Sequence, residues 1–501
     1  MSILDQLHSI ASLTGIAFAC FAASRILPGW IPARIVPTYP VARDYLTGAG
    51  GLRGVAALTV VISHAATMSF DSFGAETTWA TVLRSLSGIG MPLFFILSGF
   101  VLYYRYAGRI VHDPVISSAN FLVSRFARLY PLLFCVLIVQ FPVPAPGSSA
   151  SSAENVMTML SFLSMSQSWF FAFAGDRLLL WEYLDVSWSI STEFLFYVFF
   201  PFLCLYLVDR SGRPTPWPII GLVLSGWIVC VVASANFETL QSAAISFAGR
   251  NVSVDSSPLE QHPSDVFHWF FYFSPYMRFW EFTIGVFVAR LALASDAKEI
   301  RDGGRLIEAA ALAGLIALFY VFYLERPLLV YIRSEFVIHN VGLAPALAVL
   351  IFLVTVDRNA ILSRLLSRPF FVFFGEISYS LYLGHIIVFA AVRSTVVGID
   401  RSDGTVALLT ALALVVAATG FALVLRQIEE PLRRLVRDHL SFERGTDGRI
   451  RWLWHRDFWR SDSTGGIAAV ALRGAIGLWI AVPIVSLAGY LATMAIIGVG
   501  H

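Results

Sequence analysis

Residues 51–64 read GLRGVAALTVVISH, an apolar stretch with Arg53 near its start and His64 at its end. Each residue of an α-helix turns by about 100°, so the steps from Arg53 to His64 complete close to three turns and rise by roughly 16 Å. Both ionisable side chains are therefore predicted to lie on one face of one helix. Hydrocarbon penalises such groups, so that face should look into the protein or into water. His64 is then either a functional residue or a histidine that a neighbouring helix satisfies.

The composition indicates a membrane protein. Hydrophobic residues make up 57% of the 501 residues and charged residues 14%, whereas soluble proteins carry about 25% charged residues. The net charge of +2 comes with no basic block suited to nucleic acid, so no nucleic-acid partner is expected. The four cysteines sit in apolar stretches and favour packing roles over a disulfide framework. Neither an HExxH motif nor a CxxC pair is present, and no metal is expected.

Apolar runs long enough to cross a bilayer recur along the chain, and we predict roughly twelve spans. Arginine and lysine place residues 105–120, 292–305 and 427–472 in the cytoplasm, and residues 236–266 outside. Residues 156–174 are predicted to be interfacial or re-entrant. Residues 427–472 combine charge with three tryptophans, which indicates an amphipathic segment at the interface. Besides the helix of Arg53 and His64, the spans are predicted at 9–24, 87–104, from 125, 188–208, 217–235, 267–291, 306–324, 337–356, 373–396, 405–426 and 473–498.

The chain divides into three predicted regions. Residues 1–46 hold an apolar run without a basic n-region or a clear cleavage site, which favours a retained helix over a signal peptide, and then a proline-broken basic connector. Residues 47–434 form the main membrane domain. Residues 435–501 hold the rest of the cytoplasmic segment and a last transmembrane helix. Both ends of the chain are expected outside the cytoplasm.

A set of short motifs occurs in order across residues 47–434. One of them, Ser98-Gly99, offers a small surface where a second helix backbone can approach. Each motif is weak alone, and the ordered set is specific. The motifs are Arg53-x10-His64, the run ending at Phe100, Arg125-x-x-Arg128-x-x-Pro131, Trp188-Ser189-x-x-x-Glu193, Arg278-x-x-Glu281-Phe282-x-x-Gly285, Ser378-Tyr379-Ser380-Leu381-Tyr382-Leu383-x-His385 and Glu430-Pro431-x-Arg433.

This ordered set resembles the acyltransferase-3 family of integral membrane O-acyltransferases. The resemblance implies an all-α fold, a polytopic transmembrane bundle of about ten core helices, here with an extra helix at each end. It also implies transfer of an acyl group, usually acetyl from cytoplasmic acetyl-CoA, to a hydroxyl. The acceptors in the family are mostly sugars of envelope polysaccharides, lipid-linked glycans or small metabolites such as macrolides. Gly384 departs from the family pattern, which usually has tryptophan there, and the departure concerns the packing beside His385.

Three residues are candidates for catalysis in such a reaction. A sugar hydroxyl needs a base near neutral pH, so His64 is predicted to be the general base or a transient acyl carrier. Arg53 is predicted to hold donor phosphate or to stabilise oxyanion charge, unless it is a snorkelling anchor. Glu193 is predicted to orient a catalytic histidine or to bind an acceptor hydroxyl, unless it is a structural acid paired with an arginine.

The donor is predicted to bind two further arginines. Arg125 and Arg128 are spaced i, i+3 at an expected helix start, where the helix dipole and the guanidinium fork both favour a phosphate. The diphosphate of coenzyme A would suit them. The alternative is that both are ordinary cytoplasmic topology charges.

The acceptor-binding candidates are Ser378, Tyr382, His385 and Trp188. The first three follow a spacing of about 3.5 residues, so they face one way and either line the acceptor path or hydrogen-bond between helices. Aromatic residues near span ends, such as Trp188, are more often interface belts than sugar platforms. Arg278 and Glu281 are expected to neutralise each other.

Two other classes of function stay open at the level of sequence. Buried arginine, histidine and glutamate in many spans also occur in transporters, although no paired broken helices mark corresponding halves here. A scaffold without catalysis is the third possibility. The acyltransferase interpretation implies acyl-CoA, a carbohydrate or lipid-linked glycan acceptor and membrane lipid as partners, and the bacterial cytoplasmic membrane as location.

Overall fold

The computed structural model of the chain describes most of the predicted membrane domain. The described residues are 47–73, 78–140, 150–175, 177–208, 217–236, 239, 269–294, 309–316, 343–357, 360–396, 404–444, 450–454 and 481–490. The predicted span at 9–24, the loop 240–266 and most of the spans at 306–324 and 473–498 lie outside the described residues.

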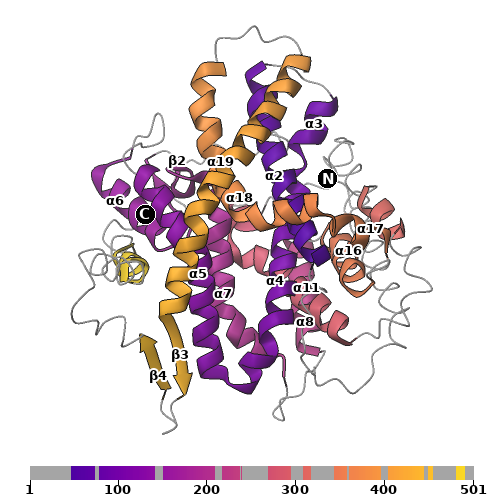
Figure 1. The fold of residues 1–501 in the computed structure, drawn as a ribbon, viewed down its shortest axis with the longest axis vertical. Helices are drawn as coiled ribbons and strands as arrows, with labels where there is room; N and C mark the ends of the chain where they lie inside the picture. The colour runs from indigo at the N-terminus through magenta and orange to yellow at the C-terminus, as the bar shows by residue number, and fades with distance from the viewer. Residues whose placement is uncertain are drawn as a thin grey trace.

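The described chain confirms an all-α fold, a bundle of long helices (Figure 1) with two small antiparallel hairpins, β1–β2 and β3–β4. The longer helices are α2 (Thr47–Phe73), α4 (Ser87–His112), α5 (Pro114–Gln140), α7 (Trp188–Tyr206), α8 (Trp217–Ala235), α11 (Pro275–Ala294), α16 (Ala344–Val356), α18 (Pro369–Val396) and α19 (Gly404–His439). The shorter elements are α3 (Thr78–Arg84), α6 (Ser152–Leu163), β1 (Phe173–Ala174), β2 (Arg177–Leu178), η3 (Leu179–Trp181), η4 (Asp185–Ser187), the π-helical turn η5 (Trp269–Phe273), α17 (Ile361–Leu366), β3 (Leu440–Arg444) and β4 (Ile450–Trp454).

Six helical stretches in the described residues are long and apolar enough to span a membrane. They lie at Thr47–Ser69, Val82–His112, Pro114–Gln140, Asp185–Tyr206, Pro369–Val392 and Thr405–Arg437. The apolar parts of α8 and α16 are shorter, and α11 carries three charged residues. The protein is therefore an integral membrane protein, and the predicted count of roughly twelve spans is reached only in part within the described residues.

Helix α2 packs against α18 through glycines. A Cβ added at Gly54 would meet the carbonyl of Phe371 in α18, and one added at Gly51 would meet that of Leu366 at the end of the preceding helix α17. On the facing helix, a Cβ at Gly375 would meet the carbonyl of Gly50. Small residues let helix backbones approach closely in a membrane, where no hydrophobic force drives helices together. These glycines therefore decide that α2 and α18 lie side by side.

The predicted close approach at Ser98-Gly99 is confirmed on α4. A Cβ added at Gly99 would meet the carbonyl of Phe282 on α11, and one added at Gly285 of α11 would meet the carbonyl of Ile96. The two glycines thus form a reciprocal contact between α4 and α11. Gly90 makes the other face of α4 equally close to α2, because a Cβ there would meet side chains of Thr59 and Val60.

Two segments that were predicted to be cytoplasmic differ in their secondary structure from the prediction. Residues 105–112 belong to α4 rather than to a loop, and α5 starts at Pro114, so only Asp113 separates the two helices. Helix α19 runs through the predicted boundary at 434/435 as far as His439, and the β3–β4 hairpin follows it. The side-chain amide of Asn120 on α5 exchanges two hydrogen bonds, of 2.9 and 2.8 Å, with the backbone of Phe442. This pair docks the hairpin on α5 where the sequence predicted an amphipathic segment.

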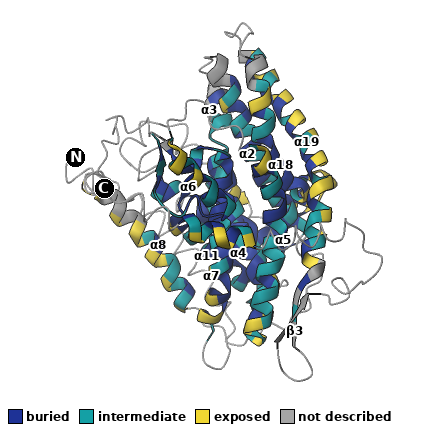
Figure 2. Ribbon diagram, turned by 90° about the vertical axis from the view of Figure 1, so that its left-hand side faces the viewer, coloured by how far each residue is buried: buried dark blue, intermediate teal, exposed yellow. Residues whose placement is uncertain are grey.

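Figure 2 shows exposed residues along the outward sides of α8 and α19, and many of them are large and apolar. Leu409, Leu412 and Val416 of α19 are each more than half exposed, which suits contact with lipid chains. The predicted interfacial region 156–174 consists of α6, a non-helical segment with buried serines, and the first strand of the β1–β2 hairpin.

Candidate active site

The two histidines at the centre of the bundle are in direct contact. His64 Nδ1 on α2 lies 2.9 Å from His385 Nε2 on α18. The ring planes differ by only 18°, and the ring centres are 5.2 Å apart, so the two nitrogens sit on the facing edges of the rings. His385 is fully buried, whereas His64 is partly exposed. The hydrogen-bonding neighbour that the sequence left open for His64 is therefore a second histidine.

His385 is held in place by its own helix. Its Nδ1 lies 3.2 Å from the carbonyl oxygen of Leu381. The ring is flanked by Tyr382, at 5.8 Å between ring centres, and by Phe389, at 5.4 Å. The neighbouring Gly384, where the family pattern has tryptophan, lies against Leu425 of α19. Without a large side chain there, α19 packs directly behind the His385 helix.

Of the remaining acceptor candidates, Tyr382 makes an interhelical bond and Ser378 does not. The Tyr382 hydroxyl lies 2.7 Å from Ser189 Oγ on α7 and donates to the carbonyl of Val186 at 2.9 Å. Ser378 Oγ donates to the carbonyl of Gly375 in its own helix at 2.9 Å. Tyr382 thus ties α18 to the start of α7 one turn before His385.

A cluster of three arginines and one carboxylate lies on the other side of the bundle interior. Arg53 of α2 is within electrostatic range of Arg125 and Arg128 of α5 and of Glu193 of α7. Tyr197, one turn after Glu193, belongs to the same group. The helix of Arg53 and His64 is continuous, as predicted, so the arginine cluster and the histidine pair lie about 16 Å apart along α2.

The arginines of the cluster differ in how they are held. Arg125 donates to the Tyr106 hydroxyl at 2.8 Å and lies over the Tyr106 ring at 5.2 Å. Among the described residues, Arg53 and Arg128 make no hydrogen bond or ion pair, and Arg53 Nε is buried. The prediction that Arg125 and Arg128 open a helix is wrong, because α5 starts at Pro114. The helix dipole therefore contributes nothing at these residues, and their guanidinium charges act alone.

Glu193 lies with the arginines rather than beside the histidines. Ser98 Oγ donates to its Oε1 at 2.8 Å, and the Tyr197 hydroxyl donates to the same oxygen at 2.5 Å. These two bonds are to neutral hydroxyl groups, and the roles predicted for Glu193, orienting a histidine, binding an acceptor hydroxyl or pairing with an arginine, stay predictions. One carboxylate faces three guanidinium groups, so the cluster carries a net positive charge.

Trp188 belongs to a buried aromatic group around a structural ion pair. Its ring lies 5.3 Å from Tyr272, and the Arg278 guanidinium is 4.5 Å from the Tyr272 ring centre. Arg278 Nη1 bonds Glu281 Oε1 at 2.6 Å with both side chains fully buried, which confirms the predicted mutual neutralisation. Trp188 is 5% exposed, so it is part of the core and not of an interface belt.

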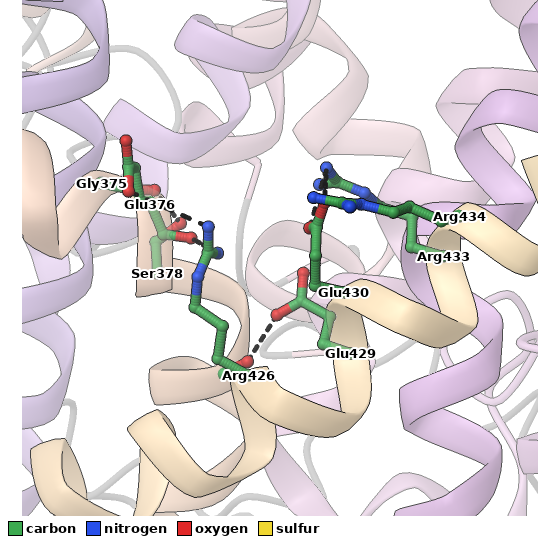
Figure 3. A network of polar contacts seen from close by, with 9 residues as sticks. Gly375, Glu376, Ser378, Arg426, Glu429, Glu430, Arg433 and Arg434 are labelled. Atoms are coloured by element: carbon green, nitrogen blue, oxygen red, sulfur yellow. Dashed lines mark hydrogen bonds and ion pairs between the residues drawn. The ribbon is translucent and has the colours of Figure 1, made fainter.

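A further polar contact between α18 and α19 was not singled out from the sequence. Ser380 Oγ donates to the buried Glu429 Oε2 at 2.5 Å. Glu429 lies next to Glu430, which pairs with Arg433 and Arg434 (Figure 3). Ser380 belongs to the motif at residues 378–385, but its spacing predicted no role for it. On the exposed side, Arg426 donates to the backbone of Glu376 at 2.5 Å. These contacts hold α18 and α19 together on the N-terminal side of His385 along α18.

Comparison with known proteins agrees with this arrangement of residues. A family model described as an acyltransferase domain matches residues 47–427, which include every candidate residue. The chain belongs to the acyltransferase-3 family. It is therefore a membrane acyltransferase, with an acyl donor and an acceptor as its substrates.

Relatives of this acyltransferase carry matching names. Acyltransferase MdmB of Streptomyces mycarofaciens is 26% identical over 350 residues, which cover 68% of this chain and 77% of the relative. A putative O-acetyltransferase of Staphylococcus aureus strain COL is 22% identical over 361 residues, 70% of this chain. The matched part is 52% of that relative, so the acyltransferase spans about half of its length. No solved structure matches the chain.

Within the described part of the acyltransferase, no three histidine, cysteine, aspartate or glutamate side chains gather as a metal site. Family membership supports catalysis over the transporter and scaffold alternatives. The roles of the individual site residues remain predictions, to which the geometry adds the pairing of His64 with His385.

Proposed function

We propose that this acyltransferase moves an acetyl group from acetyl-CoA to a hydroxyl of a carbohydrate, with His64 as general base. The acceptor is a cell-envelope glycan or its lipid-linked precursor, and the enzyme works in the bacterial cytoplasmic membrane. The observation that carries the proposal is the pair of centres on α2, a positive cluster at Arg53 and a partly exposed imidazole at His64.

The positive cluster supports a phosphate-bearing donor. Three buried or partly buried guanidinium groups around one carboxylate are costly in a membrane interior unless an anion balances them. Guanidinium groups recognise phosphate through paired hydrogen bonds, and coenzyme A carries phosphates at one end and its thioester at the other. With the phosphates at Arg53 and Arg128, the extended pantetheine arm runs along α2 toward His64.

The chemistry at His64 is a balanced acyl transfer. The imidazole takes the proton of the acceptor hydroxyl while the hydroxyl oxygen attacks the thioester carbonyl carbon. The carbon–sulfur bond then breaks, and the departing thiolate of coenzyme A takes the proton back from His64. The enzyme ends in its starting state, and the new bond is an ester of the acceptor.

The acceptor class rests on the chemistry and on the names of relatives. A putative O-acetyltransferase among the relatives favours acetyl over a longer acyl chain and oxygen over nitrogen as acceptor atom. Tyr382, whose ring centre lies 5.8 Å from that of His385, and its partner Ser189 form the buried wall on the α7 side of His385. The acceptor approaches His64 along its exposed edge, since His385 closes the opposite edge.

The test is an acetyl-transfer assay with purified wild-type and His64→Ala protein. We expect the wild type to consume acetyl-CoA in the presence of envelope glycan. The rate of His64→Ala should be lower by a factor of about 10²–10⁴. A His112→Ala variant serves as control, because His112 is exposed at the end of α4. Near wild-type turnover by folded His64→Ala would overturn the base assignment.

A covalent acyl-histidine is the second candidate for the role of His64. The same assay distinguishes the two by rapid quench with labelled acetyl-CoA and no acceptor. Label retained on wild-type protein but absent from His64→Ala would indicate a carrier. Mass spectrometry of envelope glycans with and without the gene then identifies the acceptor.

A further inference from the structure

The contact between His64 and His385 determines which nitrogen of each ring carries a proton. A carbonyl oxygen only accepts hydrogen bonds, so the 3.2 Å contact with Leu381 requires the proton of His385 on Nδ1. A neutral histidine carries one ring proton, which leaves His385 Nε2 with a lone pair. The 2.9 Å contact from that atom to His64 Nδ1 then needs a proton on His64 Nδ1.

We propose that His385 is a positioning residue that holds His64 as the tautomer whose Nε2 lone pair faces the substrates. The hydrogen bonds run in one direction, from His64 Nδ1 to His385 Nε2 and from His385 Nδ1 to the Leu381 carbonyl. The tautomer assignment stands on these contacts alone, while its use in catalysis rests on the proposed role of His64 as base.

The burial of the two rings supports this division of roles. His385 is fully buried between Tyr382 and Phe389, with α19 behind it, so its ring is closed to an acceptor in this conformation. His64 is partly exposed, and its only edge free of His385 is the one that carries Nε2. His385 therefore acts through His64 and does not touch the reacting atoms.

His385 also stabilises the charged form of His64 during transfer. When His64 Nε2 takes the proton of the acceptor hydroxyl, the ring becomes an imidazolium whose Nδ1–H already points at the His385 lone pair. A hydrogen bond from a charged donor is roughly twice as strong as a neutral one. The buried carboxylate of a Ser-His-Asp triad has the same two tasks, orientation and stabilisation of the imidazolium. Here a neutral imidazole backed by a helix carbonyl performs them.

Nitrogen-15 NMR of histidine-labelled protein in liposomes tests the tautomer directly, without any substrate. Protonated and bare ring nitrogens have distinct chemical shifts. The chain has 10 histidines, and difference spectra with His64→Gln and His385→Gln assign the two of interest. We expect His64 to carry its proton on Nδ1 in the wild type and to become a mixture of tautomers in His385→Leu. A wild-type His64 protonated on Nε2, or an unchanged tautomer in His385→Leu, would overturn the proposal.

Kinetics of two His385 variants separate positioning from packing. Glutamine places a carbonyl oxygen near the position of Nε2 and can accept from His64 Nδ1, whereas leucine cannot. We expect His385→Leu to lower kcat at least tenfold with little change in the KM for acetyl-CoA, and His385→Gln to keep several times more activity than His385→Leu. Equal losses in both variants would refute the positioning role. If wild-type protein transfers no acetyl group, the proposed reaction is wrong, while the NMR result still decides the tautomer.

Discussion

Replacing Arg128 by alanine tests whether the positive cluster binds the acyl donor. Arg128 has no hydrogen bond or ion pair among the described residues, and it lies within electrostatic range of Arg53. Removing it therefore breaks no hydrogen bond or ion pair within the described residues. If Arg128 binds a donor phosphate, its loss shows in donor affinity rather than in folding.

The expected loss of acetyl-CoA affinity is that of one charged hydrogen-bonding partner. Such a partner is worth about 1.5–3 kcal/mol, or roughly ten- to a hundredfold in affinity. A ligand at 100 times its Kd stabilises the folded protein by about 2.7 kcal/mol, and a ten- to hundredfold weaker site at the same concentration gives only about 0.4–1.4 kcal/mol. Without donor, Arg128→Ala should melt no lower than wild type, because one of three neighbouring like charges is gone.

Calorimetry in detergent measures acetyl-CoA affinity, and thermal unfolding with and without the donor gives the second readout. Arg128→Lys should recover only part of the loss, since it keeps the charge and loses the fork. Arg434→Ala is the matched control, because Arg434 is 64% exposed and paired with Glu430 at 2.9 Å. Arg125→Ala should weaken the donor too, and also lower stability through loss of its bond to Tyr106. Unchanged donor affinity in Arg128→Ala would show that this arginine does not bind the donor and only marks the cytoplasmic side of the chain.

Three further predictions concern packing and topology. Ser189→Ala and Tyr382→Phe should each cost about 1 kcal/mol, and the double variant less than their sum, because both break the 2.7 Å contact; additive losses in unfolding experiments would contradict this. Gly375→Leu should separate α2 from α18, which should abolish acetyl transfer and change the wild-type NMR signals of His64 and His385. Full activity in this variant would show that the close packing is dispensable. A cysteine that replaces Arg109 or Lys298 should not be labelled by an impermeant thiol reagent added outside the cell. Ready labelling at either position would overturn the predicted topology.

Local periodicity and composition decided a large part of the architecture from the sequence. The apolar runs and sparse charge predict a helical membrane protein, because a backbone in hydrocarbon must satisfy its hydrogen bonds within each span. The spacing of Arg53 and His64 places them on one helix, which α2 confirms. The close approach at Gly99 also followed from residue size alone. The loop predicted after residue 104 and the span end predicted at residue 426 were wrong, because α4, α5 and α19 continue as helices through these polar residues. Polarity ends an apolar run in the sequence, but it does not end a helix whose backbone hydrogen bonds continue.

Which helices meet was decided only by the tertiary structure. His64 and His385 are 321 residues apart, and no periodicity within either helix relates them. Their contact depends on the glycines that bring α2 and α18 together, and a glycine does not specify its partner helix. The same is true of Glu193, for which the sequence left a histidine, an acceptor hydroxyl and an arginine open as partners, and which the packing of α7 places near Arg53 and Ser98. Helical spacing fixes directions within one segment, whereas a site built from four segments requires the packing of all of them.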